Sequence, residues 1–426
     1  MKPPYFSQQN GAATLVVVMV LFFVMAMMAA FASRNMVFEQ RISSNYYRAG
    51  AALETAEAGA EWALGMLNGL NINEACLSDP AANSFRQRYL GINSQTRTIT
   101  PVRIDGSAAA DCVRTELNGW QCRCPAAAWT APVGAPAAVA NMQPSFHVIF
   151  PKPFFSNRAG IVRISSTGCT SSTLADCEGV EIARDSVVAQ SVVSVDAALV
   201  SALKTPPAMP LVVKGGIALD ADGIGLHNSD NGPSNGLLLL TADPVVPNLI
   251  DGRLNSIPGT PPQQAILLND QALASATPAL MFAQYFGMSA ARYKSQPAMR
   301  TVSCAADCGP SLLAAYNSGV RMAWIDGPML IATTTVLGTA ADPMLIVVAG
   351  DVVIDGALQM TGLLYAQGDL AWANTTGLQA LLTGALIVEG DLAVVGVVNL
   401  WYQSSVMDRM KNGMGSFVRV PGSWWN

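Results

Sequence analysis

Apolar side chains fill the beginning of the chain. No charged residue occurs between Ala12 and Ser33, and almost every position in that segment is apolar. About twenty apolar residues at roughly 1.5 Å each match the roughly 30 Å hydrocarbon core of a bilayer. A cleaved secretory signal is the alternative, but its apolar region spans only about 7–15 residues. The pattern therefore predicts a membrane-spanning helix over residues 12–33.

The helical pattern continues beyond this segment, as residues 34–70. No proline occurs between Pro4 and Pro80, and apolar residues recur at steps of three and four, which places one stripe on one helix face. The sequence thus predicts one helix from Ala12 to Asn68 whose stripe docks a head. The docking residues are Ile42, Tyr46, Leu53, Ala56, Ala60, Leu64 and Leu67. A membrane anchor followed by a separate short helix, broken at Gly50 or Gly59, is the alternative.

All eight cysteines follow the membrane segment. An even number on one side of a membrane indicates disulfides in an oxidising compartment. Cys169 with Cys177 and Cys304 with Cys308 form local pairs, whereas Cys76, Cys112, Cys122 and Cys124 allow three pairings. A metal site is the weaker alternative, because Cys122 and Cys124 lack the spacing of a zinc knuckle and no histidine lies nearby.

Residues 71–205 are predicted to form a cysteine-containing, β-rich domain. Short β-like runs cover 145–150, 160–166 and 187–195, and the Asn118-Gly119 turn signal indicates a hairpin within the cysteine cluster. The Pro/Ala-rich stretch 125–144 is expected to be a surface loop. A boundary is predicted at the prolines of 206–210.

Residues 206–426 contain repeated apolar strands that end in glycine turns. The glycines of the last four turns, Gly327, Gly350, Gly368 and Gly390, lie 23, 18 and 22 residues apart. Each unit is too short to bury its own apolar face, so stacking around one core is expected. The pattern predicts a parallel β-solenoid-like repeat domain, and an antiparallel sandwich is the alternative.

A helical insertion interrupts these repeats. Thr277 is suited to the N-cap and Pro278 to the first helical position. Leu280, Phe282, Tyr285 and Phe286 would form its apolar patch, which we expect to cap the solenoid core. The predicted fold class is therefore α+β: a long helix followed by a β-rich head.

The composition narrows the possible functions. The chain is 51% apolar, only 12% charged and carries a net charge of −5, whereas about a quarter of residues are charged in an ordinary domain. These values exclude disorder and argue against nucleic-acid binding. His147 and His227 belong to no recognisable catalytic arrangement, and no phosphate-binding loop is present. We expect no enzyme, no cofactor and no metal.

One alternative chemistry involves the Gly-Asp pairs of the repeats. Asp351, Asp369 and Asp391 would stack into a carboxylate ladder that binds Ca²⁺ or acts on a polysaccharide. Aspartate beside glycine is ordinary turn chemistry, which is the favoured interpretation.

The N-terminal residues resemble the PilX-type, minor pilin-like proteins of type IV pilus assembly. The resemblance rests on the Gly11-Ala-Ala-Thr-Leu-Val run, Glu39-Gln40-Arg41, Asn45 with Arg48, and Ala56-Glu57-Ala58-Gly59; the ending Gly422-Ser423-Trp424 is also similar. It implies a leader over residues 1–11 that prepilin peptidase removes after Gly11, leaving Ala12 as the new terminus. The leader departs from the pattern in having only Lys2 as a charge, and the second alanine blurs the cut site.

The resemblance also implies a place in a filament. Residues 12–33 would form the filament core, with Leu15, Val16, Leu21, Phe22 and Phe23 packing against other subunits. Major pilins carry a glutamate shortly after the cut, where this chain has Val16, or Val17 if the cut falls one residue later. A buried carboxylate without a partner is costly, and a tip subunit has no earlier subunit to pair with, so this position suits the tip.

The implied function is a structural subunit that primes pilus assembly and supports adhesion and twitching motility. Its partners would be other minor pilins, the major pilin, prepilin peptidase and a tip adhesin. It would first be a single-pass protein of the inner membrane with a periplasmic head, and then part of the extracellular pilus. The alternatives are the tip pseudopilin of a type II secretion system and a membrane-anchored β-solenoid that binds polysaccharide.

Overall fold

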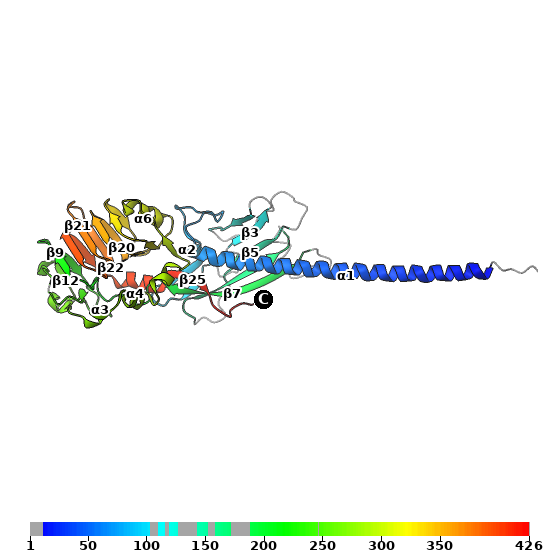
Figure 1. Cartoon of the computed structure of the whole chain (residues 1–426), viewed down its shortest axis with the longest axis horizontal. Coiled ribbons are helices and arrows are strands. Elements are labelled where there is room, and N and C mark those ends of the chain that lie inside the picture. Colours follow the sequence, from blue (N-terminus) through cyan, green and yellow to red (C-terminus); the bar gives the residue numbers. More distant parts are fainter. Residues whose placement is uncertain are drawn as a thin grey trace, which may run out of the picture.

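The molecule is a long helix with a β-rich head at one end (Figure 1). The computed structural model describes residues 12–102, 110–115, 119–126, 143–151, 158–171, 188–245 and 247–425. Helix α1 (Ala12–Leu67) has 56 residues, which makes it roughly 84 Å long. It passes through Gly50 and Gly59 without a break, so the prediction of one continuous helix is confirmed and the two-helix alternative is wrong.

A six-stranded antiparallel sheet packs against the last part of α1. Its strand order is β25-β7-β6-β5-β3-β4. The strands are β3 (Ala110–Thr115), β4 (Gly119–Arg123), β5 (Ser145–Ile149), β6 (Ile161–Cys169), β7 (Gln190–Ser201) and β25 (Gly415–Arg419). The predicted hairpin is confirmed, because β3 and β4 pair with Cys112 opposite Cys122.

An aromatic cluster fills the space between α1 and this sheet. Trp62 of α1 lies 5.6 Å from Phe85 and 5.7 Å from Phe146, measured between ring centroids. Phe85 begins helix α2 (Phe85–Tyr89). Ser84 and Gln87 form a capping box at the N-terminus of this helix. The strands β1 (Leu90–Ile92) and β2 (Ile99–Pro101) form a separate antiparallel pair after α2.

The second part of the head is a solenoid of parallel strands. One sheet has twelve strands, with the path β12-β10-β24-β22-β20-β18-β15-β14 and β8, β11, β13 and β17 beside it; the other is β16-β19-β21-β23-β9. The partners Met322↔Leu345, Leu345↔Leu363 and Leu363↔Ala385 are 23, 18 and 22 residues apart, like the turn glycines. The parallel solenoid prediction is therefore confirmed, and the antiparallel sandwich is wrong.

The solenoid strands are short. They comprise β8 (Leu211–Val213), β9 (Ile217–Leu219), β10 (Ile224–His227), β11 (Leu239–Thr241), β12 (Leu254–Asn255), β13 (Ile266–Leu267), β14 (Met299–Thr301), β15 (Met322–Ile325), β16 (Met329–Ile331), β17 (Thr335–Leu337), β18 (Met344–Val348), β19 (Val352–Asp355), β20 (Leu358–Ala366), β21 (Leu370–Asn374), β22 (Ala380–Val388), β23 (Leu392–Gly396) and β24 (Val398–Trp401). The short 3-10 helices η2 (Asp251–Arg253) and η3 (Pro262–Ala265) precede β12 and β13. Aliphatic side chains from successive coils fill one continuous core inside the solenoid.

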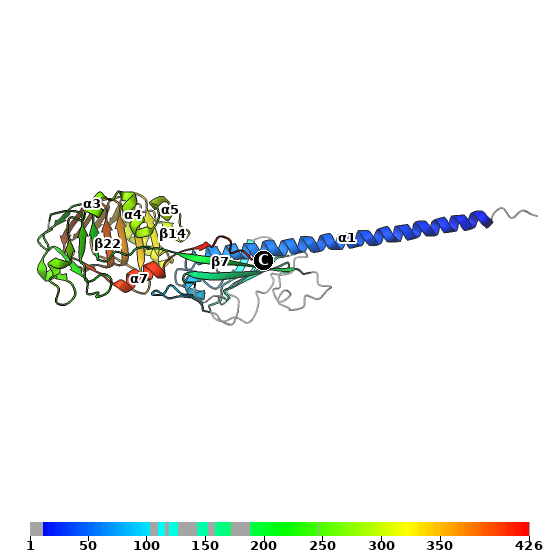
Figure 2. The same cartoon turned by 90° about the horizontal axis from the view of Figure 1, so that it is seen from below.

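The coils are not stacked in chain order. Leu386 of β22 pairs with Leu211 of β8, and Leu400 of β24 pairs with Leu226 of β10, so the last coil stacks on the first. The chain continues from β13 into the helices α3 (Gln271–Ser275), α4 (Pro278–Phe286) and α5 (Ala290–Lys294). These helices run back along one side of the solenoid to β14, at the other end of the stack (Figure 2). The insertion is thus the return path between the two ends of the stack.

Helix α4 begins as the sequence predicts. Thr277 is its N-cap and accepts a hydrogen bond from the Leu280 N–H at 3.3 Å, and Pro278 is its first residue. Two expectations need correction. Leu280 is 60% exposed, because Met281 takes the buried position. The aromatic residues pack on a flank of the solenoid, beside Tyr365 and Trp324, and do not cap its end.

The expected domain boundary at residue 206 also needs correction. After β24 and helix α7 (Ser404–Asn412), the chain returns to the first sheet, where β25 pairs with β7. The last strand of the expected solenoid domain therefore completes the antiparallel sheet. Pairing with β7 gives hydrogen-bond partners to backbone N–H and C=O groups of β25. These groups would have no partner strand at the end of the solenoid.

Candidate functional site

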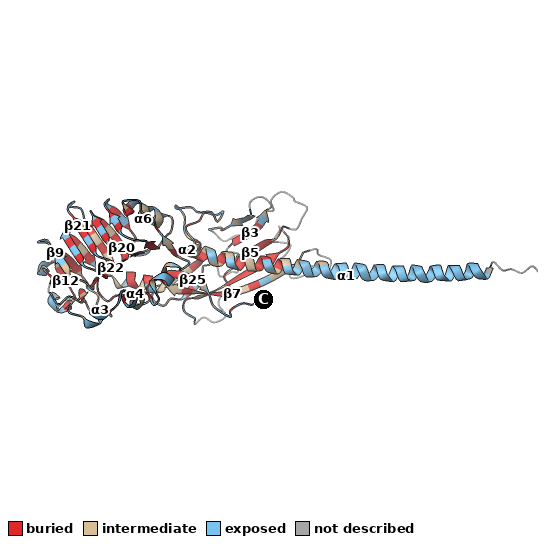
Figure 3. Ribbon diagram, viewed as in Figure 1, coloured by how far each residue is buried: buried red, intermediate tan, exposed pale blue. Residues whose placement is uncertain are grey.

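The first half of α1 projects away from the described parts of the head and is not buried by them. Every residue from 13 to 43 is exposed (Figure 3). The expected filament residues Leu15, Val16, Leu21, Phe22 and Phe23 are each more than half exposed. Within the described residues, α1 is the one helix whose length and composition suit a membrane span. Its charge-free apolar part, residues 12–33, requires lipid or other protein around it.

The expected processing site lies at the start of this rod. Ala12 is the first residue of α1, and Gly11 lies outside the described residues. Cleavage after Gly11 therefore stays a prediction.

The second half of α1 packs on the antiparallel sheet through small residues. Ala52, Ala56, Ala60 and Ala63 are at most 2% exposed. Gly59 belongs to the same stripe: a Cβ there would lie 2.2 Å from Ser166 Oγ and 2.7 Å from Phe146 Cδ2. Small side chains allow the helix backbone to approach the sheet closely.

Part of the expected docking stripe is wrong. Ile42 is 44% exposed and Tyr46 is 79% exposed, because the head begins only near Ala52. Ala56, Ala60 and Leu67 are buried against the head, and Leu53 and Leu64 are half-buried. Ile42 and Tyr46 therefore belong to the projecting half, together with the exposed Met36, Phe38 and Tyr47.

Polar contacts fix the end of α1 to the head. Asn68 Nδ2 donates to the carbonyl oxygen of Phe417 at 2.9 Å, and its Oδ1 accepts from the Phe417 N–H at 2.7 Å. Arg86 Nε donates to the Leu67 carbonyl oxygen at 3.3 Å, and an Arg300 Nη donates to the Asn68 carbonyl oxygen at 2.8 Å. Cations at these positions satisfy carbonyl groups that a helix C-terminus leaves without partners.

None of these three residues is marked by a local pattern in the sequence. Asn68 was expected only as the helix end, and Arg86 and Arg300 lie in segments without a periodic signal. The available signal was that one asparagine and two isolated arginines occur in a chain with few charged residues, where such side chains often have a specific partner. Their partners lie up to 349 residues away, which no local pattern records.

The structure joins the clustered cysteines in one of the three possible ways. Cys76 pairs with Cys124, and Cys112 pairs with Cys122 across the β3–β4 hairpin. Cys304 pairs with Cys308, which begins helix α6 (Cys308–Asn317). Cys177 lies outside the described residues, so the pair with Cys169 stays a prediction. Among the described residues, no group of His, Cys, Asp and Glu side chains is arranged to hold a metal.

The Gly-Asp pairs of the solenoid serve its turns. Asp351 Oδ1 accepts from the Asp369 N–H at 2.9 Å, and Asp369 Oδ1 accepts from the Asp391 N–H at 2.8 Å. Asp391 Oδ1 in turn accepts from the Gly216 N–H at 2.7 Å. Each carboxylate thus joins one coil to the next. This geometry supports the turn interpretation over a ladder that binds Ca²⁺ or acts on polysaccharide.

The match to a known protein family concerns the helix. Residues 10–61 match the family model described as PilX N-terminal. No curated protein matches the chain in sequence. Among solved structures, a crystal structure of the competence-associated pilin ComZ from Thermus thermophilus is similar at 11% identity, over 89% of this chain and 97% of that chain, with a TM-score of 0.22. Residues 10–61, which include most of helix α1, therefore match the PilX N-terminal domain family.

Proposed function

We propose that the chain is a minor, non-enzymatic structural subunit of a type IV pilus, placed at or near the filament tip. The observation that carries this proposal is the projecting half of α1, which is exposed from residue 13 to residue 43. Lipid would cover its apolar part before assembly, and helices of other subunits would cover it afterwards. Other minor pilins, the major pilin and prepilin peptidase are the expected partners.

Two features support a place at the tip. Val16 stands where major pilins have a glutamate, so this subunit offers no carboxylate to the N-terminus of an earlier subunit. The head combines an antiparallel sheet with a stacked solenoid, and this long head extends beyond the end of α1 (Figure 1). Such a head is difficult to accommodate between neighbours in a shaft, whereas the tip leaves it free for adhesion.

Mass spectrometry of the N-terminus tests whether the chain is a filament subunit. Sheared pili and membranes would be analysed separately for intact mass and N-terminal peptides. A chain that starts at Ala12 in the sheared fraction is expected. An uncut chain confined to membranes would contradict the proposal and favour an anchored solenoid.

The position along the filament needs its own test. Gold-labelled antibody against the solenoid is expected to mark one end of each sheared pilus. Labelling along the whole length would exclude the tip position while leaving the subunit assignment intact. Loss of secretion without loss of pili on deletion would instead favour the pseudopilin alternative.

A further inference from the structure

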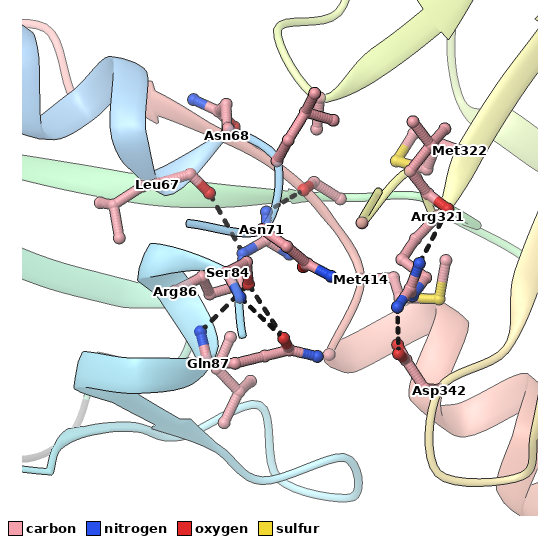
Figure 4. Close-up of a pocket in the computed structure, with 18 of the residues that line it drawn as sticks. Leu67, Asn68, Asn71, Ser84, Arg86, Gln87, Arg321, Met322, Asp342 and Met414 are labelled. Carbon is pink, nitrogen blue, oxygen red and sulfur yellow. Dashed lines mark hydrogen bonds and ion pairs between the residues drawn. The ribbon is translucent and has the colours of Figure 1, made fainter. Parts of the chain in front are cut away.

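A cavity of about 260 Å³ lies where the end of α1 meets the solenoid (Figure 4). It is distinct from the projecting half of the helix. Segments from α1, α2, β14, β15 and α7 line it. The charged residues of its lining are four arginines, Arg86, Arg300, Arg321 and Arg409, and one aspartate, Asp342. The lining therefore carries three more positive charges than its one carboxylate offsets.

The arginines are engaged to different degrees. Arg86 and Arg300 cap α1, and an Arg321 Nη contacts Asp342 Oδ2 at 2.6 Å. Arg409 forms no side-chain hydrogen bond or ion pair with the part of the chain that the structure describes. Among the described residues that line the cavity, Asp342 is the one carboxylate.

Two polar atoms at the cavity are buried and unpartnered among the described residues: Arg321 Nε and Asn71 Oδ1. Asn71 is 6% exposed, and its Nδ2 donates to the Asn317 carbonyl oxygen at 3.2 Å, which fixes the orientation of the amide. In Figure 4, Asn71 lies between Arg86 on one side and Arg321 on the other. The cavity thus presents one unused buried donor, Arg321 Nε, and one unused acceptor, Asn71 Oδ1, beside the guanidinium group of Arg409, which is free among the described residues. Arg86, by contrast, also donates to the Gly415 carbonyl oxygen at 2.6 Å.

Leaving such groups without partners is unfavourable. A buried donor, acceptor or charge without a partner costs free energy. Burial lowers the pKa of Arg86 to about 10, although the nearby Asp342 raises it. An anion in the cavity would supply the missing compensation.

We propose that this cavity binds a small oxyanion that also carries an O–H donor, such as hydrogen phosphate or a hydroxy-carboxylate. Its oxygens would accept from the arginines, which favour carboxylate and phosphate groups, and its hydroxyl would donate to Asn71 Oδ1. A volume of about 260 Å³ restricts the ligand to a small molecule. Because Arg86, Arg300 and Arg409 come from α2, β14 and α7, the ligand would join three parts of the head.

The test uses the purified full chain in detergent at constant ionic strength. Phosphate, glucuronate, acetate and chloride are compared by thermal unfolding and calorimetric titration. Phosphate or glucuronate is expected to raise Tm by about 2 °C or more at a hundredfold excess over Kd. Acetate, which lacks the donor, is expected to bind at least tenfold more weakly. Binding of phosphate alone or glucuronate alone identifies which oxyanion the cavity takes.

Variants separate the cavity from other sites. Arg409→Gln removes no described contact and is expected to weaken binding at least tenfold, whereas the exposed Arg292→Gln serves as the matched control. Arg321→Lys keeps a cation beside Asp342 but removes Nε, and it is expected to weaken binding similarly. Equal effects of chloride and phosphate, no binding of either oxyanion, or unchanged affinity in both cavity variants would overturn the proposal. These outcomes do not depend on the proposed pilus function.

Discussion

Gly168 of β6 lies directly against the backbone of Ala56 in α1. A Cβ on Gly168 would be 2.3 Å from Ala56 N and 2.2 Å from the Ala52 carbonyl oxygen, distances that real Cβ atoms do not reach. Gly168 is also paired with Phe146 on one side and Ser191 on the other, so β6 has little freedom to move away. The glycine therefore sets how closely the helix lies on the sheet.

Replacing Gly168 by alanine should separate the helix from the sheet. We expect Gly168→Ala to lower the free energy of unfolding by about 1–3 kcal/mol, the usual cost of overpacking. Thermal unfolding of the full chain in detergent measures it. Gly50→Ala is the matched control, because nothing lies within 4 Å of a Cβ there and alanine favours a helix by roughly 0.5–1 kcal/mol. Equal stability of the two variants would contradict the close approach.

Asn68, which follows α1, should contribute more to stability than the asparagines of the helix itself. Asn68→Ala removes both side-chain hydrogen bonds to Phe417. The buried backbone N–H and carbonyl groups of Phe417 then lose these partners. We expect a loss of about 2–4 kcal/mol, measured by chemical denaturation. Asn45→Ala, at an exposed position of the projecting half, is expected to change stability by less than about 0.5 kcal/mol. A similar small effect at Asn68 would show that this contact does not anchor the helix.

The disulfides should differ in their contribution to stability. Cys76–Cys124 closes a sequence separation of 48, and Cys304–Cys308 closes one of only 4. Chain entropy then predicts that replacing the first pair by serine costs about 4 kcal/mol and the second about 2 kcal/mol. Thermal unfolding of the two double variants under oxidising conditions measures the difference. The reverse order would mean that native contacts, not loop closure, decide the effect.

Glu389 should make the head less stable as pH rises. Its side chain is buried beside Tyr365, whose hydroxyl donates to Oε1 at 2.6 Å, and burial raises the pKa of the carboxyl above its ordinary value of 4.5. The folded state then binds more protons than the unfolded state between these two pKa values, so stability falls across that window as pH increases.

The variant Glu389→Gln tests this pH dependence. It is expected to match the natural chain in Tm near pH 4.5 and to exceed it at pH 8, because the neutral amide cannot ionise. The exposed Glu54→Gln is the control and should leave the pH profile unchanged. A profile with the same slope in Glu389→Gln would assign the dependence to another group.

Tyr46 should matter for assembly but not for head stability. Its side chain is 79% exposed and lies before the head begins, so Tyr46→Ala should change the free energy of unfolding by less than about 0.5 kcal/mol. If the projecting half packs in a filament, the amount of protein in sheared pili should fall several-fold. Leu77→Ala, 64% exposed on the head, is the control. Normal incorporation of Tyr46→Ala would place this part of α1 outside the subunit interface.

Local signals in the sequence determined several elements. The charge-free segment and the steps of three and four specified one helix, Thr277 and Pro278 specified the start of α4, and the spacing of the turn glycines matched the register of the coils. Each signal involves residues that are close in sequence. The physical constraints behind these signals act over a few residues. They are the periodicity of a helix, the capping of its ends and the need for glycine at tight turns.

Only the tertiary structure decided where these elements meet. Ile42 and Tyr46 have the hydropathy of core residues but lie before the head, whereas the close contact uses Ala52, Ala56 and Gly168. The stacking of the last coil on the first, the return of β25 to the first sheet and the pairing of Cys76 with Cys124 are likewise long-range choices. They depend on backbone pairing and close fit between segments far apart in the chain, and neither leaves a periodic pattern in the sequence.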